Sequence, residues 1–337
     1  MKKVSAIIVN WNGRDVTSDC IRSLLAQDYS NLEIIVSDNG STDGSNELIR
    51  QEFPSVIRVE NGCNLGFGTA VNRGLEAASG DHLIFLNNDL VLDPDSIGEL
   101  VALLESDATI GAVVPKILYV EKPDTLNSFG VLVHYSGMAC PKGIDTRDSP
   151  NLRIIETACG GIFMLKREVY ERVGGFDEDF FLYHEDHDFS WRIRLDGWKI
   201  MVTPKAAFRH HYHFSKGVRK FYSSEKNRLL LLLKNFEWKT LLIISPALLA
   251  VELAQWVHAL MNGWFFLKIK SYFEIIGLIP KIIKKRQDIC ALRKVSDREI
   301  TRLHEGILAI GGVKNPLLDK VLSPILNGYW KLIRGLI

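Results

Sequence analysis

The apolar run VSAIIV at residues 4–9 stops abruptly at the polar sequence NWNG, residues 10–13. A second run of the same kind, EIIVS at residues 33–37, leads into DNGSTDGS at residues 38–45. Between the two runs, apolar side chains recur at the spacing of one helix face. The pattern predicts a strand, a helix and a second strand, with each strand ending in a polar loop.

The same alternation continues along the chain. Runs at residues 56–59 and 81–86 predict two more strands, each preceded by a helical segment. Alternating strands and helices indicate the α/β class, with a mainly parallel central sheet flanked by helices. Ligands of such sheets bind beyond the carboxyl ends of the strands, so the loops there form the candidate site.

Four of these loops, at residues 10–13, 38–45, 61–68 and 87–89, are rich in Asn, Asp and Gly. Any one of them is a plausible turn, because these residues tolerate left-handed backbone. Four such loops at one sheet edge would bring amides, carboxylates and free backbone N–H groups into one cleft. A sugar nucleotide requires this combination of groups.

An acidic cluster lies further along the chain. Residues 176–188 contain six Asp or Glu side chains among four aromatic residues, which is unusual for a solvated surface. A buried carboxylate either has a raised pKa or binds a cation. A predicted strand at residues 198–202 is followed by a second group of titratable side chains, RHHYH at residues 209–213.

The composition excludes several classes of protein. With 337 residues, 47% hydrophobic and 24% charged, the chain is neither disordered nor a disulfide-stabilised miniprotein. A net charge of +1 argues against a dedicated nucleic-acid-binding protein. The five cysteines are widely spaced and form no C-x-x-C pair, which indicates reduced thiols in the cytoplasm and no zinc site.

The charge is unevenly distributed. Residues 261–302 contain ten Lys or Arg against four Asp or Glu, and residues 303–337 add +2, so residues 1–260 carry −7. The uncharged runs 240–251 and 253–267 are separated by Glu252, and neither reaches the roughly 18 residues of a membrane span. Neighbouring lysines and aromatic residues suit a helix in the membrane interface. A membrane span and a soluble helical subdomain or oligomer contact are the alternatives.

Taken together, the loops resemble those of glycosyltransferase family 2, in particular its bacterial rhamnosyltransferase-like branch. Residues 4–13, 38–45, 64–72 and 85–89 carry the resemblance in the first half of the chain. Three further motifs carry it in the second half: 160–164, 174–177 and 185–186. The resemblance covers residues 3–235 and implies a GT-A fold.

The resemblance also implies that different parts of the chain have different roles. Residues 1–235 would form the catalytic domain, with a nucleotide-sugar half at 1–110 and an acceptor half at 111–235. Outside the resemblance, the composition of residues 236–337 predicts a helical, apolar and basic region that associates with the membrane. The implied reaction is transfer of a sugar from a nucleotide-sugar donor to a hydroxyl group, with inversion at the anomeric carbon.

Roles for individual residues follow from the same resemblance. Asp186 would be the general base, and Glu185 would orient the acceptor or the base. Asp89 would bind Mg²⁺ or Mn²⁺ together with His211, with His210 and His213 as alternative ligands. The family's usual metal motif has two carboxylates, whereas this chain has Asn-Asn-Asp at residues 87–89. The implied nucleotide-sugar-binding residues are Val9, Asn10, Asp38, Asn64, Gly66, Asn72 and Asn88.

The implied partners are a nucleotide-sugar donor, a glycan or lipid-linked acceptor and a membrane surface, with no nucleic acid and with a homo-oligomer left open. dTDP-rhamnose is the donor that the branch suggests, and UDP- and GDP-sugars are alternatives. The implied location is the cytoplasmic face of the inner membrane. A noncatalytic nucleotide-sugar or glycan binder is the competing hypothesis. A nucleotidyltransferase would need a glycine-rich, basic loop after the first strand, where NWNG is followed only by Arg14.

Overall fold

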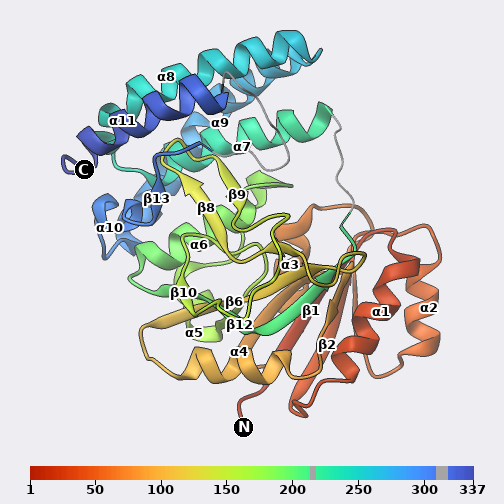
Figure 1. The fold of residues 1–337 in the computed structure, drawn as a ribbon. Helices are drawn as coiled ribbons and strands as arrows, with labels where there is room; N and C mark the ends of the chain where they lie inside the picture. The colour runs from red at the N-terminus through yellow and green to blue at the C-terminus, as the bar shows by residue number, and fades with distance from the viewer. Residues whose placement is uncertain (213–217, 309–317) are drawn as a thin grey trace.

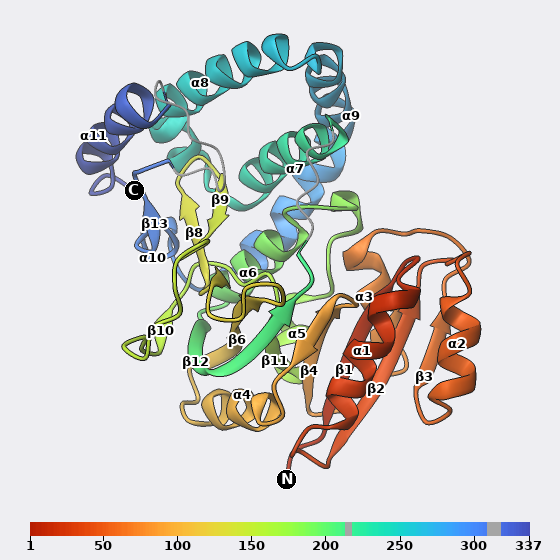
Figure 2. The ribbon, with the colours of Figure 1, turned by 45° about the vertical axis from the view of Figure 1, so that its right-hand side comes forward.

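The computed structural model describes residues 1–212, 218–308 and 318–337. Within them, a ten-stranded mixed sheet lies at the centre, with helices on both faces (Figures 1 and 2). Its order is β10-β12-β6-β11-β4-β1-β2-β3, with β5 beside β12 and β7 beside β6. The strands of this sheet are β1 Val4–Asn10, β2 Leu32–Asp38, β3 Ile57–Glu60, β4 His82–Asn87, β5 Leu90–Leu92, β6 Ile110–Tyr119, β7 Leu126–Ser128, β10 Ile155–Glu156, β11 Met164–Lys166 and β12 Lys199–His210.

The parallel part of the sheet is built around β1, which pairs in parallel with both β2 and β4. All seven residues of β1 are buried. Ala6 and Ile8 lie in the apolar core on one face of the sheet, and Ile7 and Val9 lie in the core on the other face. Burial on both faces explains why the run is apolar throughout rather than alternating. The predicted α/β class with a mainly parallel sheet is confirmed.

Helices cover both faces of the sheet, and the two cores show which helix lies where. One core contains apolar side chains of α1, α2 and α4, and the other contains side chains of α3, α5 and α6. Their bounds are α1 Arg14–Leu25, α2 Ser45–Glu52, α3 Phe67–Leu75, α4 Ser96–Glu105, α5 Arg167–Val173 and α6 Glu185–Leu195.

The sheet is irregular beyond β4. The short strand β11 runs antiparallel between β4 and β6, because the residues before it form a turn at Gly160 and Gly161. The strand β12 runs parallel to β6 and is longer than the predicted strand at residues 198–202. It continues to His210, which pairs with Leu90 just after the end of β4. The extension carries the histidine sequence to the edge of the sheet where the polar loops lie.

Of the remaining helices, α7, α9 and α10 pack on α6, whereas α8 packs on α9 and α11 packs on α8. All of them share one apolar core with α6, which includes Trp191 of α6 and Trp330 of α11. The strand β13 (His304–Glu305) adds to a small second sheet, where it pairs in parallel with β8 (Val131–His134) beside β9 (Ala139–Pro141). The helices are α7 Val218–Asn235, α8 Trp238–Met261, α9 Phe265–Leu292, α10 Asp297–Thr301 and α11 Ser323–Ile333.

A buried charge network joins α7, α8 and α9. Glu252 of α8 accepts hydrogen bonds from Arg228 of α7 and from Lys268 and Tyr272 of α9. Glu225 of α7 accepts from the same two cations, at 2.6 Å from Arg228 and 2.7 Å from Lys268. Both cations are buried, so removal of one carboxylate would leave an uncompensated charge. The network therefore holds the three helices in one arrangement.

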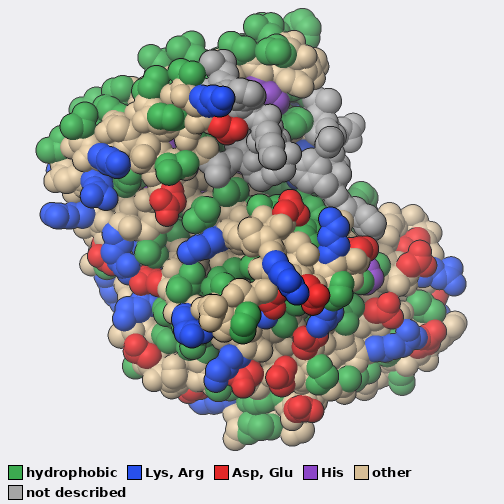
Figure 3. Space-filling view, viewed as in Figure 1, with side chains coloured by type: hydrophobic (Ala, Val, Ile, Leu, Met, Phe, Trp, Pro, Cys, Tyr) green, Lys and Arg blue, Asp and Glu red, His purple; other side chains and the backbone are tan. Residues whose placement is uncertain are grey.

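The outer side of α8 and α11 is apolar. Large side chains recur every three, four or seven residues along α8, which places them on one side of the helix. Figure 3 shows hydrophobic side chains gathered where these two helices lie. Among the described residues, only α8 is long and apolar enough to cross a membrane, by length and composition. We call the following exposed residues the α8–α11 apolar face: Leu242, Leu249, Leu253, Val257, Leu260, Ile325 and Leu332.

Candidate active site

The loops at the ends of β1, β2 and β4 are tied together by the buried side chain of Asn10. Its Nδ2 donates to Asp38 Oδ1 at 2.8 Å and to Ser45 Oγ at 2.9 Å. Its Oδ1 accepts from Thr17 Oγ1 at 2.8 Å and from Asn88 Nδ2 at 2.9 Å. Asn10 therefore holds the three loops together, and Val9 supports it from the core below.

The carboxylate of Asp38 organises the second loop. Besides Asn10, it accepts hydrogen bonds from the backbone N–H of Ser41 at 3.0 Å and from the Ser41 hydroxyl at 2.6 Å. Asp38 is only 4% exposed. The structure thus brings Asp38, Asn10 and Asn88 together at one end of the parallel strands, as expected from the sequence.

The third loop is fixed against the second half of the chain. Asn64 Oδ1 accepts from the backbone N–H of Gly66 at 2.9 Å. Gly66 has a φ of +83°, and a Cβ atom there would lie 2.1 Å from the carbonyl oxygen of Phe181. Only glycine allows this approach, which places the donor-side loop against the segment leading to Glu185.

Asn72 is located differently from the other predicted donor-binding residues. Its Nδ2 donates to the carbonyl oxygen of Phe176 at 2.9 Å, and its Oδ1 accepts from the Phe176 N–H at 2.8 Å. Both ends of the amide are used to hold the backbone at residue 176 against α3. The geometry therefore gives Asn72 a structural role in place of the predicted contact with the nucleotide sugar.

Asp89 follows β4 and faces a histidine at the end of β12. Its Oδ2 lies 3.2 Å from Nε2 of His210, and its Oδ1 is buried without a hydrogen-bond partner among the described residues. The predicted ligand His211 instead donates its backbone N–H to the Asp89 carbonyl, and its ring lies 4.0 Å from Glu121. Side chains alternate along a strand, so only one of two adjacent histidines can face Asp89. The alternative His213 lies outside the described residues.

A hydrogen-bond relay orients the ring of His210. Its Nδ1 lies 3.1 Å from Asn127 Oδ1, and Asn127 also bonds to the hydroxyl of Tyr119. Tyr119 donates its proton to Asp145 at 2.9 Å, so the Asn127 amide nitrogen donates to Tyr119 and its oxygen faces His210. An Nδ1–H of His210 would donate to Asn127 Oδ1 and leave Nε2 as the ring nitrogen that faces Asp89.

This arrangement fits a divalent cation. Asp89 Oδ2 and His210 Nε2, both potential ligands, lie 3.2 Å apart, and the second Asp89 oxygen lacks a partner among the described residues. Carboxylate oxygen and imidazole nitrogen are suitable ligands for Mn²⁺, and Mg²⁺ is commonly held by one or two carboxylates together with substrate phosphates. The described residues contain no group of three or more His, Cys, Asp or Glu side chains able to hold a metal.

Glu185 and Asp186 begin α6, and neither pairs with a cation in the part of the chain that the structure describes. Asp186 Oδ1 accepts from the His187 N–H at 2.8 Å, and its Oδ2 faces Gly161. Glu185 Oε2 is buried without a partner among the described residues. Burial raises the pKa of the Glu185 carboxyl, and the neighbouring Asp186 raises it further. Burial also raises the pKa of Asp186.

The position of Gly161 relates Asp186 to the polar loops. The backbone N–H of Phe85 on β4 donates to the carbonyl of Phe163, because β4 and β11 are antiparallel neighbours. The residues before Phe163 therefore run toward the carboxyl end of β4, and Asp89 follows that end in sequence. Asp89 and Asp186 are thus brought to the same edge of the sheet.

Three of the other four acidic residues of the cluster, Asp177, Asp179 and Asp188, pair with cations. Asp177 pairs with Lys234 and Lys285, and Asp188 pairs with Lys234 and Arg192. The sequence-based expectation that buried carboxylates have raised pKa values is confirmed only for the pair at the start of α6. The lysines that pair with the other carboxylates of the cluster come from α7 and α9, and no local sequence motif predicts these pairs.

Comparison with known proteins identifies the fold and chemistry class. The profile described as "Glycosyl transferase family 2" matches residues 5–174. This chain belongs to glycosyltransferase family 2. A second profile, "N-terminal domain of galactosyltransferase", matches residues 149–216. The family membership makes the protein a glycosyltransferase, and the predicted resemblance to the rhamnosyltransferase-like branch is confirmed.

Two bacterial family 2 relatives are 30% identical to this chain. One is the N-acetylglucosaminyl-diphospho-decaprenol L-rhamnosyltransferase of Mycobacterium tuberculosis (strain ATCC 25618 / H37Rv), aligned over 212 residues, 55% of this chain and 68% of that protein. The other is the O-antigen biosynthesis protein RfbC of Myxococcus xanthus, aligned over 230 residues, 64% of this chain and 18% of that protein.

Solved structures show that this family 2 chain has the GT-A fold. GalNAc-T7 with UDP, GalNAc and Mn²⁺ has a TM-score of 0.58 and 19% identity, over 70% of this chain and 49% of that one. The mannosyltransferase PcManGT from Pyrobaculum calidifontis, in complex with GDP-Man and Mn²⁺, has a TM-score of 0.52 and 17% identity, over 86% of each chain. At these identities the likeness concerns the fold alone.

Proposed function

We propose that the protein is an inverting glycosyltransferase that transfers a sugar from a nucleotide-sugar donor to a hydroxyl of a lipid-linked or polysaccharide acceptor. The observation that carries the proposal is the pair of carboxylates, Asp89 and Asp186, at one edge of the sheet. Asp89 faces Nε2 of His210, whereas Asp186 pairs with no cation among the described residues and has a pKa raised by burial. Asp89 would thus hold a cation that binds the diphosphate leaving group, and Asp186 would accept a proton.

Asp186 would act as the general base. The acceptor hydroxyl oxygen attacks the anomeric carbon while its proton moves to Asp186 Oδ2, the oxygen that faces Gly161. The new carbon–oxygen bond forms on the face opposite the breaking bond to phosphate, and the nucleoside diphosphate leaves. Glu185 has a raised pKa, so its protonated carboxyl can donate a hydrogen bond that orients the acceptor or Asp186.

Asp89 and His210 would hold Mg²⁺ or Mn²⁺, and the bound cation would offset the negative charge that develops on the diphosphate. The group formed by Asn10, Asp38 and Asn88 would lie next to the nucleoside. The backbone of Val9 would lie at the edge of this group. The loop of Asn64 and Gly66 would line the ribose or diphosphate. We further propose residues 1–110 as the donor half and 111–235 as the acceptor half, with dTDP-rhamnose as the donor because of the rhamnosyltransferase relative.

Residues 236–337 would place the enzyme on the cytoplasmic face of the inner membrane, where a lipid-linked acceptor is available. The α8–α11 apolar face would contact the lipid. Glu252 lies near the middle of α8 and is bound to Arg228 and Lys268, so crossing the bilayer would require breaking these ion pairs. We therefore favour a helix that lies along the membrane surface, which the net charge of +8 over residues 261–337 would reinforce.

A donor screen tests the proposed chemistry. We expect dTDP-rhamnose, among dTDP-, UDP- and GDP-sugars, to raise the melting temperature of the purified protein in the presence of Mn²⁺. A ligand at 100 times its Kd stabilises a folded protein by about 2.7 kcal/mol, which a thermal-shift assay detects. The stabilisation should shrink when EDTA replaces Mn²⁺. If none of the nucleotide sugars stabilises the protein or is consumed with an acceptor, the proposal is wrong.

A vesicle-binding experiment tests the proposed membrane contact. The double substitution Leu249→Asp and Leu253→Asp places two charges on the α8–α11 apolar face, and we expect at least about tenfold weaker co-sedimentation with phosphatidylglycerol vesicles. Leu25→Asp is the matched control, because Leu25 is 54% exposed on α1, outside that face. Equal vesicle binding by the double variant and the control would contradict the assignment of this face.

A further inference from the structure

The loop between α5 and α6 leads directly into the two unpaired carboxylates. We call residues 174–184 the base loop. Phe181, Tyr183 and His184 have φ values of +50°, +69° and +66°, so three of the four residues before Glu185 adopt the left-handed conformation that non-glycine residues disfavour. Such a conformation persists only where surrounding contacts hold it.

Backbone contacts hold both ends of the base loop. At its start, Arg192 donates to the carbonyl oxygens of Val173 at 2.6 Å and Gly175 at 2.8 Å. At its end, the buried side chain of Asn227 on α7 donates to three carbonyl oxygens within 2.5 to 2.9 Å. These acceptors belong to Phe180, Leu182 and Tyr183.

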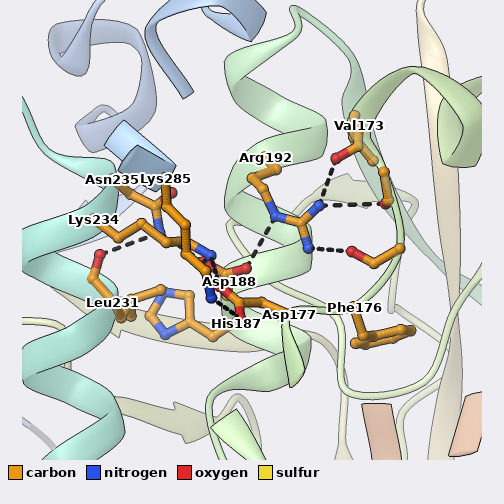
Figure 4. Close-up of polar contacts among 12 residues, drawn as sticks. Val173, Phe176, Asp177, His187, Asp188, Arg192, Leu231, Lys234, Asn235 and Lys285 are labelled. Atoms are coloured by element: carbon orange, nitrogen blue, oxygen red, sulfur yellow. Dashed lines mark hydrogen bonds and ion pairs between the residues drawn. The ribbon is translucent and has the colours of Figure 1, made fainter. Parts of the chain in front are cut away.

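The middle of the base loop is held by Lys234 of α7 and by Lys281 and Lys285 of α9. Lys234 of α7 donates to Asp177 Oδ2 at 2.7 Å and also pairs with Asp188 Oδ1 at 2.6 Å. Lys285 of α9 donates to Asp177 Oδ1 and to Asp179 Oδ2, the latter at 2.6 Å. Figure 4 shows Lys234 and Lys285 reaching Asp177 from helices that follow the loop in sequence. Although burial opposes the shift, the two ammonium groups hold the pKa of Asp177 well below its usual range.

Packing alone does not set the distance between α9 and the base loop. A cavity of about 360 Å³ separates them in part, and Gly175, Asp177 and Lys285 are among the residues that line it. Because this space is not filled by side chains, ion pairs link α9 to the base loop: Lys285 pairs with Asp177 and Asp179, and Lys281 pairs with Asp179. The side chain of Asp177 is only 8% exposed, and that of Lys285 is 26% exposed, so the pair is partly shielded from solvent.

We propose that Lys285 is a positioning residue for the transfer reaction: through Asp177 it holds the base loop so that Asp186 faces the acceptor. The inference rests on the function proposed above. The helical region thereby completes the acceptor side of the active site, although it lies outside the predicted catalytic domain. The same helix exposes Phe273, Ile276 and Ile283 to solvent, so α9 connects an apolar surface to the base loop.

The test compares Lys285→Met with Lys284→Met in the full chain. Lys284 is the neighbouring residue on α9 and is exposed. Its substitution by Met removes the same charge from the same helix. We expect Lys285→Met to lower kcat about tenfold, because small misplacements of reacting groups reduce the rate strongly. The KM for the donor should stay within about twofold of the wild-type value, because the residues proposed to bind the donor lie on other elements. Lys284→Met should match the wild type, and Lys285→Arg should recover most of the lost kcat.

Hydrogen exchange provides a readout that does not depend on the reaction. Lys285→Met should speed amide exchange in residues 177–186 relative to Lys284→Met, with unchanged exchange in β1 and β2 and a similar melting temperature. Faster exchange in a protein that transfers no sugar would support the loop contact and refute the proposed function. Equal exchange and equal kcat in the two methionine variants would overturn the role of Lys285, whatever the fate of the proposed function.

Discussion

Substitution of Asp186→Asn should abolish transfer while leaving donor binding nearly intact. The asparagine keeps the shape of the side chain but cannot accept the acceptor's proton, and loss of a general base lowers kcat by about 10² to 10⁴-fold. Thermal shift by the nucleotide sugar with Mn²⁺ should match that of the wild type. Turnover at the wild-type rate in the Asp186→Asn variant would exclude this residue as the base.

Glu185→Gln is the matched comparison for this variant. Glu185 has a raised pKa and is largely protonated, so a neutral amide should lower kcat by only about tenfold. The pH profile supplies a second check. Because the pKa of Asp186 is raised, activity should fall with decreasing pH well above the usual Asp value of about 3.9.

The loss of activity in acid should not reflect unfolding driven by these two groups. A carboxyl whose pKa is raised in the folded state contributes stability below its unfolded pKa, and that contribution is lost as the pH rises. Protonation of Glu185 and Asp186 therefore favours the folded state. Asp177 has a lowered pKa and acts in the opposite direction, but only in a more acidic range. The acid inactivation should accordingly be reversible when the pH is restored.

Asp89→Ala and His210→Ala should each remove the dependence of donor binding on Mn²⁺. We expect transfer to fall at least about 100-fold, because the diphosphate would lose its main source of charge stabilisation. His211→Ala is the matched control, since the ring of His211 lies near Glu121 instead of Asp89. A Mn²⁺ titration followed by isothermal calorimetry with donor present distinguishes the variants. Equal losses in His210→Ala and His211→Ala would contradict the assignment.

Asn127→Ala should produce an intermediate effect in the same titration. It removes the acceptor that fixes the proton on Nδ1 of His210 without removing either proposed ligand. Changes to residues that orient a metal ligand weaken metal binding by about 10- to 100-fold. Unchanged Mn²⁺ affinity in Asn127→Ala would show that the relay through Tyr119 does not contribute to the site.

Much of the fold is predictable from the sequence because its determinants are local. The run at residues 4–9 is apolar throughout, since β1 is buried on both faces, and the loops after β1, β2 and β4 are polar where a sheet of this class presents its ligand site. The predictions were less accurate where one strand continues past a change in composition. Strand β12 extends to His210, eight residues beyond the predicted strand.

The contacts that complete the site come from distant residues with no motif of their own. Asn127, Asn227 and Lys285 are ordinary polar residues until the chain folds and brings them to His210 and the base loop. The environment of Lys268 could not be predicted from the sequence either, because the composition around it predicts a membrane-facing helix. Its partner Glu225 is 43 residues earlier in the chain, so helical spacing alone cannot show that Lys268 is buried.

The charge network around Glu252 bears on how this enzyme can evolve. Two of its charges, Glu225 and Arg228, lie before residue 235, and the other two, Glu252 and Lys268, lie after it. A recombination event that joined this catalytic half to another relative's helices would leave buried charges without their counterparts. We therefore expect the two parts to be inherited as one unit, with these four positions changing together among homologues.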